Sequence, residues 1–497
     1  MKNKLASRSW CAVLLLVATP IAARAEGGCD SLMGLRLPDV RIVDAKAEPA
    51  PVPHCRASGV VGREIRFAIW LPQDWNGRFV MGGAGGFAGT VENQAMALGA
   101  LQKGYATAGT DTGHQGTAID GSWALGNLER IVNYGHVAVH RVTEVSKAIV
   151  RSHYGRDADK SFFAGCSNGG RQALMAAQRY PEDFDSIIAG APANDLTGTI
   201  AGFVYVTQRM YPDPASLDKP ILGGADRAAL RKAIVAQCDR LDGIEDDVLH
   251  DPRACSFDPK KLACGASDNA DGCLSAEELA AVEAIYGGAH SPAGRLSPGY
   301  PLGGEDKEGG WGMWLAGREG GAMAPGIPTA AYGFGLGFMR NFVYQDPSWS
   351  YAGYDFSTFE RDLALVAASI DATNPDLSAF RERGGKLLVY HGWSDSALTA
   401  LGSIDYVEAV YAKDPGAKED VRLFLMPGVL HCAGGPGPDH VDFLAALEAW
   451  ESGGPAPDEL EAQFRQGGGG RKVCAYPKQL RFLGGDPRDP ARFACEE

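Results

Sequence analysis

Short apolar runs alternate with amphipathic stretches in the first part of the chain. Apolar residues at helical spacing predict helices over residues 134–154 and 169–179, with Gly155 after the first and Pro181 after the second. Short apolar runs bounded by polar or turn-forming residues predict strands over residues 63–71, 78–81, 105–110, 161–165 and 184–189. Strands that alternate with helices predict an α/β fold, with a mostly parallel sheet covered by helices on both faces.

The same alternation returns near the C-terminus. Apolar runs predict strands over residues 386–390 and 421–426, and helical spacing predicts helices over residues 404–411 and 441–450. The two blocks share one pattern, so we assign both to a single α/β core.

The stretch between the two blocks, residues 196–380, breaks this rhythm. It is rich in Gly, Pro, Trp and Tyr, and it shows only scattered helix patterns such as residues 275–286. We interpret it as an insertion between strands of the core that forms a lid over the functional site. The chain then divides into a first core part, the lid, and a second core part with the C-terminal tail, over residues 26–195, 196–380 and 381–497.

The N-terminal segment, residues 1–25, has the pattern of a cleavable secretory signal. Three basic residues precede a short apolar run at residues 10–18, and Ala23-Arg-Ala25 provides the small residues of a cleavage site. No later apolar run approaches the roughly 18 residues that a membrane-spanning helix needs. We therefore expect a secreted or periplasmic protein without a membrane anchor.

Composition narrows the class of protein. The 497 residues are 45% hydrophobic, which excludes a wholly disordered chain. They include 47 Lys and Arg against 61 Asp and Glu, for a formal net charge of −14. Because nucleic-acid binding needs basic surface for the phosphates, this balance argues against a nucleic-acid partner.

The cysteine count agrees with export. One of the 11 Cys lies in the signal segment, and an even number in an oxidising compartment favours five disulfides. Zinc is the alternative, but the chain has no Cys-x2-Cys pair and the spacings are wide. The ten remaining cysteines are Cys29, Cys55, Cys166, Cys238, Cys255, Cys264, Cys273, Cys432, Cys474 and Cys495.

The strongest chemical signal is Gly165-Cys-Ser-Asn-Gly169, which matches G-x-S-x-G. A strand is predicted before it and a helix after it, and in that context the sharp turn lifts the Ser167 hydroxyl out of the sheet. A serine hydroxyl is a weak nucleophile that needs a base oriented by an acid, and in this fold class the acid and the base follow in that order. Asp395 and His431 come just after the late strands, so we predict a Ser167, Asp395 and His431 triad.

An oxyanion hole needs backbone N–H groups aimed at the developing negative charge. One should come from Asn168, the residue after the nucleophile. The second should come from the glycine loop Gly82-Gly-Ala-Gly-Gly86, where Gly85 and Gly86 are both candidates. Of the other histidines, His391 precedes Asp395 too closely to serve as the base, and His114 could orient or support the site.

Several motifs together resemble the tannase and feruloyl esterase family, over nearly all of the chain after the signal segment. They are Trp75–Phe79, Gly82–Gly86, Thr110–His114, Gly165–Gly170, His391–Asp395, Met426–Gly435 and the tail from Cys474 to Cys495. The resemblance implies an α/β-hydrolase fold with the triad already named. It also implies a disulfide between Cys166 and Cys432, since the family places bonded cysteines beside the serine and the histidine.

The resemblance also implies a structural calcium ion in the lid. The family motif matches Cys238-Asp-Arg-Leu-Asp-Gly-Ile-Glu-Asp-Asp-Val248, which is flanked by Cys238 and Cys255. Oxygen ligands with several acidic groups suit Ca²⁺, and Gly243 allows the loop to curl. The implied ligands are the carboxylates of Asp239, Asp242 and Asp246 and the backbone carbonyls of Ile244 and Val248. No organic cofactor is implied.

The resemblance finally implies esters of aromatic acids as substrates. We expect a secreted serine carboxylesterase for feruloyl, galloyl or terephthalate monoesters. The alternatives are a serine peptidase and a non-catalytic binding protein on the same fold, although the complete triad argues against the latter. Arg340 is a weak candidate for contacting the acid, and the lid aromatics that could form its pocket are Trp311, Trp314, Tyr332, Phe334, Phe338, Phe342 and Trp349.

Overall fold

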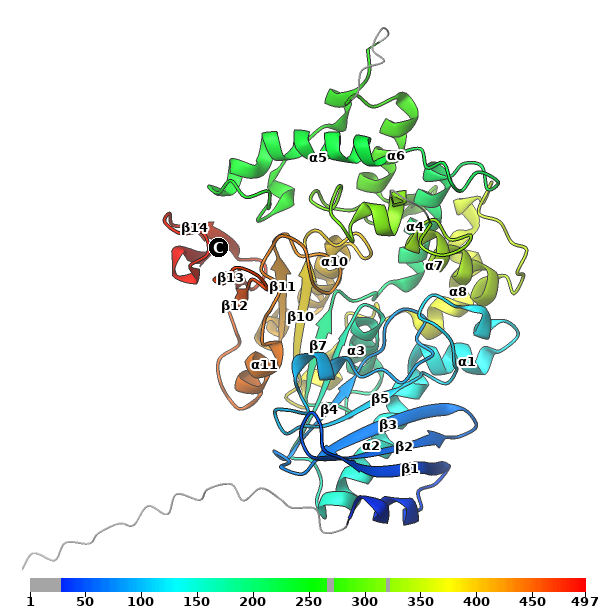
Figure 1. Ribbon diagram of the computed structural model, residues 1–497, viewed down its shortest axis with the longest axis vertical. Helices are drawn as coiled ribbons and strands as arrows, with labels where there is room; N and C mark the ends of the chain where they lie inside the picture. The colour runs from blue at the N-terminus through cyan, green and yellow to red at the C-terminus, as the bar shows by residue number, and fades with distance from the viewer. Residues whose placement is uncertain (1–27, 266–271, 319–321) are drawn as a thin grey trace, which may run out of the picture.

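A computed structural model describes residues 28–265, 272–318 and 322–497, so the predicted signal segment lies outside the described residues. At its centre is a nine-stranded sheet with the order β1-β2-β3-β5-β4-β6-β7-β10-β11 (Figure 1). The strands are β1 (Val40–Glu48), β2 (His54–Val61), β3 (Ile65–Pro72), β4 (Arg78–Gly82), β5 (Ala106–Thr110), β6 (Lys160–Cys166), β7 (Ser186–Gly190), β10 (Lys386–Gly392) and β11 (Val421–Met426).

Strands β5, β4, β6, β7, β10 and β11 pair in parallel, whereas β1, β2 and β3 form an antiparallel extension that joins β5. The predicted parallel core and both of its sequence blocks are therefore confirmed. The sequence prediction missed β1 and β2. In β1 only Ala45 is buried, so the strand lacks the apolar run that marks the central strands.

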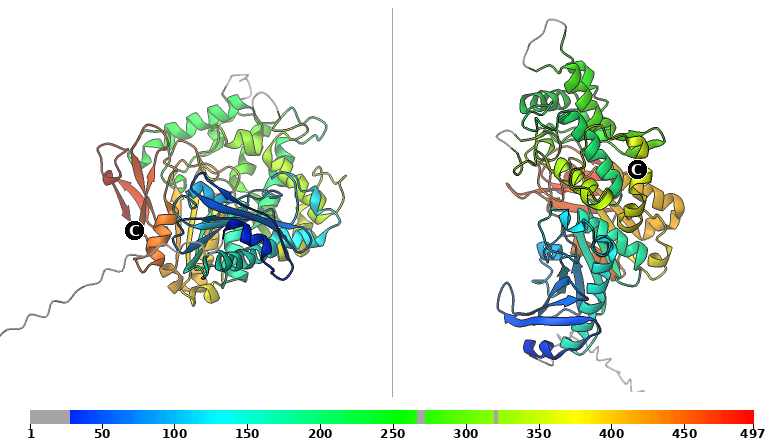
Figure 2. Two further views of the ribbon diagram at one scale, coloured as in Figure 1. Left: turned by 60° about the horizontal axis from the view of Figure 1, so that its bottom comes forward. Right: turned by 90° about the vertical axis from the view of Figure 1, so that its right-hand side faces the viewer.

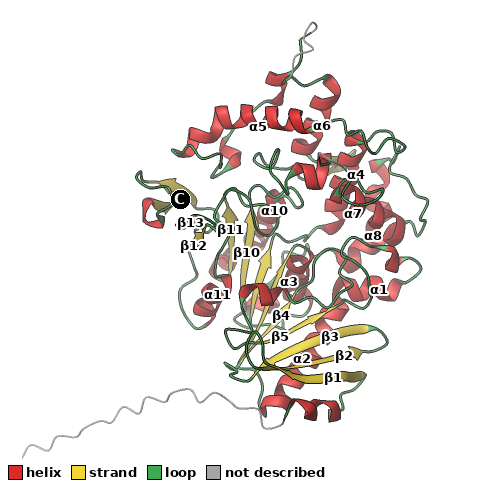
Figure 3. Ribbon diagram, in the orientation of Figure 1, coloured by secondary structure: helices red, strands yellow, loops and turns green. Residues whose placement is uncertain are grey.

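Helices cover both faces of the sheet (Figure 3). One face packs against α2 (Ala138–Tyr154), α3 (Asn168–Arg179) and α10 (Ala400–Lys413), and the other packs against α11 (Phe443–Glu451). Neighbouring residues on a strand point to opposite faces, and both faces here are covered. The central strands are therefore continuously apolar: Phe163 packs in the first core and Phe162 in the second.

Residues 196–380 lie between β7 and β10 in sequence, and their described parts gather at one end of the sheet, with β1 to β3 at the other (Figures 1 and 2). They are more helical than the sequence pattern indicates. Helices such as α4 are buried on most sides, so they lack the polar face that gives an amphipathic period. The helices are α4 (Leu196–Met210), α5 (Gly224–Cys238), α6 (Ala276–Gly287), α7 (Ala330–Phe338) and α8 (Phe359–Ile370).

Smaller elements complete the described chain. The short helices α1 (Leu128–Val132) and α9 (Ser378–Arg381) lie beside the core, and β8 (Ala289–Ser291) pairs with β9 (Gly294–Ser297). The C-terminal tail forms two hairpins, β12 (Glu459–Gln463) with β13 (Gly470–Cys474), and β14 (Gln479–Phe482) with β15 (Phe493–Glu496). Ala475, just after β13, bridges to Phe424 of β11, which ties the tail to the edge of the central sheet.

Candidate active site

Ser167 lies on a sharp turn between β6 and α3. It has φ 65° and ψ −125°, a conformation that is strained for a residue with a side chain. Glycines on either side make the turn possible. A Cβ on Gly165 would come within 2.5 Å of the Gly169 backbone, and a Cβ on Gly169 would lie 2.1 Å from Gln94 Oε1. The G-x-S-x-G spacing thus folds as a tight strand–turn–helix that exposes the serine above the sheet.

Asp395 and His431 follow the neighbouring parallel strands β10 and β11, and their side chains meet. His431 Nδ1 lies 2.7 Å from Asp395 Oδ2. The other oxygen, Oδ1, accepts the backbone N–H groups of Ala397 at 2.8 Å and Leu398 at 3.0 Å. Because a carboxylate can only accept, Nδ1 carries the proton of the neutral imidazole and Nε2 is left as an acceptor.

The Asp395 carboxyl is held in its ionised form. Its side chain is fully buried, and burial alone would raise its pKa. The attraction of His431 and the hydrogen bonds from His391 and His431 outweigh burial and hold the pKa of Asp395 well below its ordinary range. The carboxylate therefore keeps its charge at neutral pH, which is the state that orients and stabilises an imidazolium.

His391 is a second imidazole against Asp395, and the sequence reasoning did not assign it this place. Its Nε2 lies 3.2 Å from Asp395 Oδ2 and 3.0 Å from the Leu398 carbonyl, while its Nδ1 lies 2.8 Å from Ser403 Oγ. The ring is buried and does not line the cavity beside Ser167. His391 therefore contacts the Asp395 carboxylate on the side away from the cavity. The i, i+4 spacing in His391-Gly-Trp-Ser-Asp395 was the only sequence signal for this contact.

Ser167 and His431 line one cavity of about 500 Å³. The core forms one wall and residues 196–380 form the other. The Trp314 ring stands edge-on to His431, with 5.2 Å between ring centroids, and stacks with Phe334 at 6.2 Å. The residues contributed by the 196–380 segment are Leu196, Thr199, Ile200, Phe203, Trp314, Met323, Ala330 and Phe334.

The aromatic wall differs from the predicted one. Of the seven aromatic residues expected there, Trp314 and Phe334 line the cavity. Trp311, Phe338 and Phe342 are instead buried in a hydrophobic core that the 196–380 segment shares with the α/β core, and Tyr332 and Trp349 pack against that core. The cavity borders this same core, and an apolar stretch of sequence does not show which of its side chains face a cavity.

Arg340 also lies away from the cavity, since its Nε donates to the Trp349 carbonyl at 2.8 Å. Aromatic residues that the prediction did not include take the remaining places. Phe87 follows the glycine loop and packs edge-on against Phe334, with centroids 5.1 Å apart, while Tyr134 and Phe203 complete the wall.

The hydrogen bonds of the glycine loop distinguish Gly86 from Gly85. Within the described residues, the Gly86 N–H and the Asn168 N–H have no hydrogen-bond acceptor, and both residues line the cavity. Two unpaired backbone donors beside Ser167 are what an oxyanion hole requires. The N–H groups of Gly83, Ala84, Gly85 and Phe87 are engaged, with Ala164 O (2.9 Å), Gln172 Oε1 (3.0 Å), Glu92 Oε2 (3.1 Å) and Ala118 O (2.7 Å).

Side chains hold this loop in place. The Tyr134 hydroxyl donates to the Gly86 carbonyl at 3.0 Å, and Asn168 Nδ2 donates to the Ala84 carbonyl at 2.9 Å. His114 Nε2 lies 2.8 Å from the Phe87 carbonyl, and the buried ring stacks on Trp123. Burial lowers the pKa of His114 to about 4, so it is neutral at pH 7 and donates its Nε2–H to that carbonyl.

All ten described cysteines form disulfides, as the count predicted. Cys166 and Cys432 are bonded across 266 residues, with 5.9 Å between their Cα atoms, and this bond joins the serine turn to the histidine loop. The other four pairs are Cys29–Cys55, Cys238–Cys255, Cys264–Cys273 and Cys474–Cys495. The Cys238–Cys255 bond closes the acidic loop that follows α5.

The acidic loop brings the three predicted carboxylates near one another. Asp242 Oδ1 accepts the Ile244 N–H at 3.0 Å, and Asp246 Oδ1 accepts the Val248 N–H at 3.1 Å. Asp239 Oδ1 is buried without a hydrogen-bond partner within the described residues. Burial, together with repulsion from Asp246 and Asp239, raises the pKa of Asp242 to about 6, although hydrogen bonds from backbone N–H groups oppose this rise.

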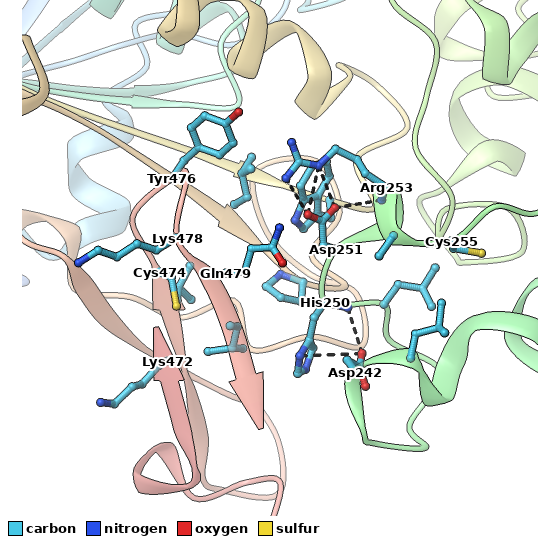
Figure 4. A pocket seen from close by; sticks show the side chains of 18 of the residues that line it. Asp242, His250, Asp251, Arg253, Cys255, Lys472, Cys474, Tyr476, Lys478 and Gln479 are labelled. Atoms are coloured by element: carbon cyan, nitrogen blue, oxygen red, sulfur yellow. Dashed lines mark hydrogen bonds and ion pairs between the residues drawn. The ribbon is translucent and has the colours of Figure 1, made fainter. Parts of the chain in front are cut away.

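A cleft of about 150 Å³ separates this loop from the C-terminal tail (Figure 4). Asp242 and His250 lie on the loop side, where the His250 N–H donates to Asp242 Oδ2 at 3.1 Å, and Lys472 and Gln479 lie on the tail side. Elsewhere on the tail, Arg471 Nη2 pairs with Asp246 Oδ2, so the tail directly contacts the acidic loop.

The acidic loop fits a cation in part. In the three described ranges, no three His, Cys, Asp or Glu side chains form a metal-binding group. The carboxylates of Asp239, Asp242 and Asp246 therefore lie near one another but do not converge on one point as three metal ligands would. The unpaired Asp239 oxygen and the mutual repulsion of the carboxylates are features that a bound cation would relieve.

A serine on a strained turn after a central parallel strand, with an Asp–His pair after the last two strands of the central sheet, defines the chain as an α/β-hydrolase. Two solved structures share the fold. Feruloyl esterase B from Aspergillus oryzae has a TM-score of 0.83 at 26% identity, over 94% of this chain and 99% of that one. The tannin acyl hydrolase from Aspergillus niger has a TM-score of 0.71 at 23% identity, over 92% and 90%.

The chain belongs to the tannase and feruloyl esterase family, whose model matches residues 52–495. Mono(2-hydroxyethyl) terephthalate hydrolase from Piscinibacter sakaiensis is 34% identical, over 91% of this chain and 86% of its own. Feruloyl esterase B from Aspergillus niger is 28% identical, over 90% and 87%. The protein is thus a carboxylic ester hydrolase that acts on small-molecule esters. No helix in the described ranges is long and apolar enough to cross a membrane.

Proposed function

We propose that this protein hydrolyses esters of aromatic acids through Ser167, His431 and Asp395. The observation that carries the proposal is the His431–Asp395 hydrogen bond of 2.7 Å, made by a histidine that lines the same cavity as Ser167 on its strained turn. This is the relation that a serine nucleophile, its base and the orienting acid require.

Each residue then has one task. His431 Nε2 takes the Ser167 hydroxyl proton as Oγ attacks the ester carbonyl carbon, and Asp395 stabilises the imidazolium that forms. The N–H groups of Gly86 and Asn168 hold the oxyanion of the tetrahedral intermediate. His431 returns the proton to the departing alcohol. Water, deprotonated in turn by His431, then attacks the acyl carbonyl, and the bond to Ser167 Oγ breaks to release the acid and restore the serine hydroxyl.

The aromatic part of the substrate is supported by the cavity and by the names of two relatives. Trp314, Phe334 and Phe87 line a space of about 500 Å³, and aromatic side chains around a cavity of this size suit a planar ring. The relatives are named for feruloyl and terephthalate esters. In this proposal the 196–380 segment acts as the lid, because it supplies Trp314 and Phe334.

We also propose that the acidic loop binds a structural Ca²⁺. Asp239, Asp242 and Asp246 would supply carboxylate oxygens and Ile244 and Val248 their carbonyls. The buried, unpaired Asp239 Oδ1 supports this. The ion would neutralise the loop where the tail contacts it.

Export to the periplasm or the medium is proposed from the N-terminal signal pattern and from the five disulfides, which persist in oxidising compartments.

The test combines turnover with active-site labelling. The wild type is expected to hydrolyse p-nitrophenyl acetate and methyl ferulate and to react with a fluorophosphonate at Ser167. Ser167→Ala is expected to lose label and to lose at least about 1,000-fold in kcat, since triad members act as a unit. Ser452→Ala, at an exposed serine, is the control. Labelling of another residue, or an active Ser167→Ala protein, would reject the assignment.

A further inference from the structure

The cavity beside Ser167 contains no charged side chain from Asp, Glu, Lys or Arg among its described lining residues. Apart from the groups already assigned to the reaction, its polar side chains are mostly engaged. The Tyr134 hydroxyl donates to the Gly86 carbonyl, and the Thr199 hydroxyl donates to the Asp195 carbonyl at 2.9 Å. The Asn168 amide donates to the Ala84 carbonyl and accepts from Arg171 Nε at 2.8 Å.

Among the described lining side chains outside the proposed triad, the Thr117 hydroxyl and the Trp314 indole N–H have no hydrogen bond within the protein. The rest of the wall consists of alkyl and aromatic groups, including Ile119, Ile200, Phe203 and Phe334. An acyl group that enters this space therefore exchanges water for mostly apolar contacts, and the free polar groups on the wall are one hydroxyl and one indole N–H, both uncharged.

From this lining we infer that the enzyme selects esters of uncharged aromatic acids with few hydroxyl groups, and that it discriminates against acyl groups that carry a second carboxylate. The inference rests on the proposed function and specifies its substrate class. It separates this chain from the activity for which its relative from Piscinibacter sakaiensis is named, because a terephthalate monoester carries a free carboxylate.

The physical reason is desolvation. A carboxylate that leaves water must find an opposite charge or several donors, and an unpaired charge in an apolar space is strongly disfavoured. The net charge of the whole chain, −14, gives an anionic acid no long-range attraction either. Hydroxyl groups are disfavoured less, because an apolar pocket rejects an added hydroxyl only weakly.

The test uses two esters that differ in one group. Methyl 4-methylbenzoate and monomethyl terephthalate have the same ring and the same scissile bond, but the second carries a carboxylate at pH 7. We expect kcat/KM for the neutral ester to be at least about 100-fold higher. Methyl gallate is expected to fall about tenfold below methyl benzoate. Equal or faster hydrolysis of monomethyl terephthalate would overturn the inference.

A cation added to the wall provides the reverse test. Met323 lines the cavity and is half-buried, so a long side chain can replace it. Met323→Arg is expected to raise kcat/KM for monomethyl terephthalate relative to the neutral ester by about tenfold or more, whereas Met323→Gln, the uncharged control, should not. An unchanged ratio in Met323→Arg would count against the inference.

Two measurements separate this inference from the proposed function. p-Nitrophenyl acetate has an acyl group too small to need the cavity, so its turnover and the labelling of Ser167 test the chemistry alone. Calorimetric measurement of the binding of the two matched esters to Ser167→Ala tests the preference of the cavity independently of the reaction. Preferential binding of the neutral ester supports the inference even if no ester is turned over, and equal binding rejects it.

Discussion

At the scale of single residues, the glycine loop shows how two adjacent positions differ in their structural requirements. Gly86 has φ 53°, and a Cβ there would lie 2.3 Å from the Ala118 carbonyl oxygen. A Cβ on Gly85 would meet nothing closer than the Gln94 and Glu92 side chains at 3.8 Å. Of these two glycines, only Gly86 requires the missing side chain, and only Gly86 has an N–H without an acceptor, which is the group that the proposed oxyanion hole needs.

Replacement of each glycine by alanine tests this difference. Gly86→Ala should displace the loop and lower kcat for p-nitrophenyl acetate by about 100-fold or more, the usual effect of losing one oxyanion donor. Gly85→Ala, the matched control, should retain activity close to the wild type. Melting temperatures measured beside kcat would identify any general loss of folding. Similar losses of kcat in both variants would contradict the assignment of Gly86.

At the scale of elements, Asp371 joins the end of α8 to the start of α4. Its carboxylate accepts the Thr197 N–H at 3.0 Å and the Thr197 hydroxyl at 2.6 Å. Burial, with further repulsion from Asp195, raises the pKa of Asp371 to about 7. The folded protein therefore keeps a proton here that the unfolded chain, with a carboxyl pKa of about 4, has already released.

This difference predicts how stability depends on pH. A raised pKa in the folded state contributes stability that is complete below about pH 4 and is lost as the pH rises through about 7. In the Asp371→Asn variant the side chain is an amide that stays neutral at every pH in this range. The melting temperature of the wild type should thus fall relative to that of the variant between about pH 5 and pH 8. A difference between the two proteins that stays constant over this range would contradict the prediction.

The disulfide between Cys166 and Cys432 connects the two loops that carry Ser167 and His431. Replacement of both cysteines by alanine should release the base loop from the serine turn and lower kcat, because proton transfer depends on their relative position. We expect this double replacement to lower activity more than it lowers the melting temperature. Closure of a 266-residue loop also stabilises the fold, by up to several kcal/mol in the chain-entropy model.

The Cys474–Cys495 disulfide, whose residues are 21 positions apart in the tail, is the matched control. Its removal should lower the melting temperature with little change in kcat. If both double variants lost the same fraction of kcat, the bond beside the proposed triad would have no special effect on the reaction. Ester turnover and thermal unfolding of the two variants are the measurements.

At the scale of the whole molecule, the acidic loop of the 196–380 segment contacts the C-terminal tail. Arg471 of β13 pairs with Asp246, and Cys238–Cys255 closes the loop onto α5. A cation bound by the folded loop stabilises the folded state by mass action. Its loss should therefore weaken the attachment of the tail as well as the loop.

Chelation should lower the melting temperature of the protein without directly removing its chemistry, because the acidic loop does not line the cavity beside Ser167. Asp239→Asn should have a lower melting temperature that no longer responds to EGTA. Asp218→Asn, at an exposed aspartate, should respond like the wild type. Elemental analysis without bound calcium, together with melting that is indifferent to EGTA, would reject the proposed ion.

The sequence by itself determined the parallel core, its two blocks, the turn at Ser167 and the positions of Asp395 and His431 after the late strands. These features are set by local backbone preference and by the order of strands, both of which leave a pattern in a single sequence. The number of disulfides also followed from the sequence. The pairing of Cys166 with Cys432 required the family resemblance, because a count leaves the partners open.

Only the tertiary structure decided which N–H of the glycine loop is free, which aromatics face the cavity and that no charged side chain lines it among the described residues. Gly86 differs from Gly85 because Glu92 accepts the Gly85 N–H, whereas the Ala118 carbonyl leaves no room for a side chain on Gly86. Trp314 lines the cavity, whereas Trp311 is buried in the adjoining hydrophobic core. Such distinctions depend on contacts between segments far apart in the chain. The sequence specifies the type of each side chain, but the packing of the folded chain determines which residues surround it.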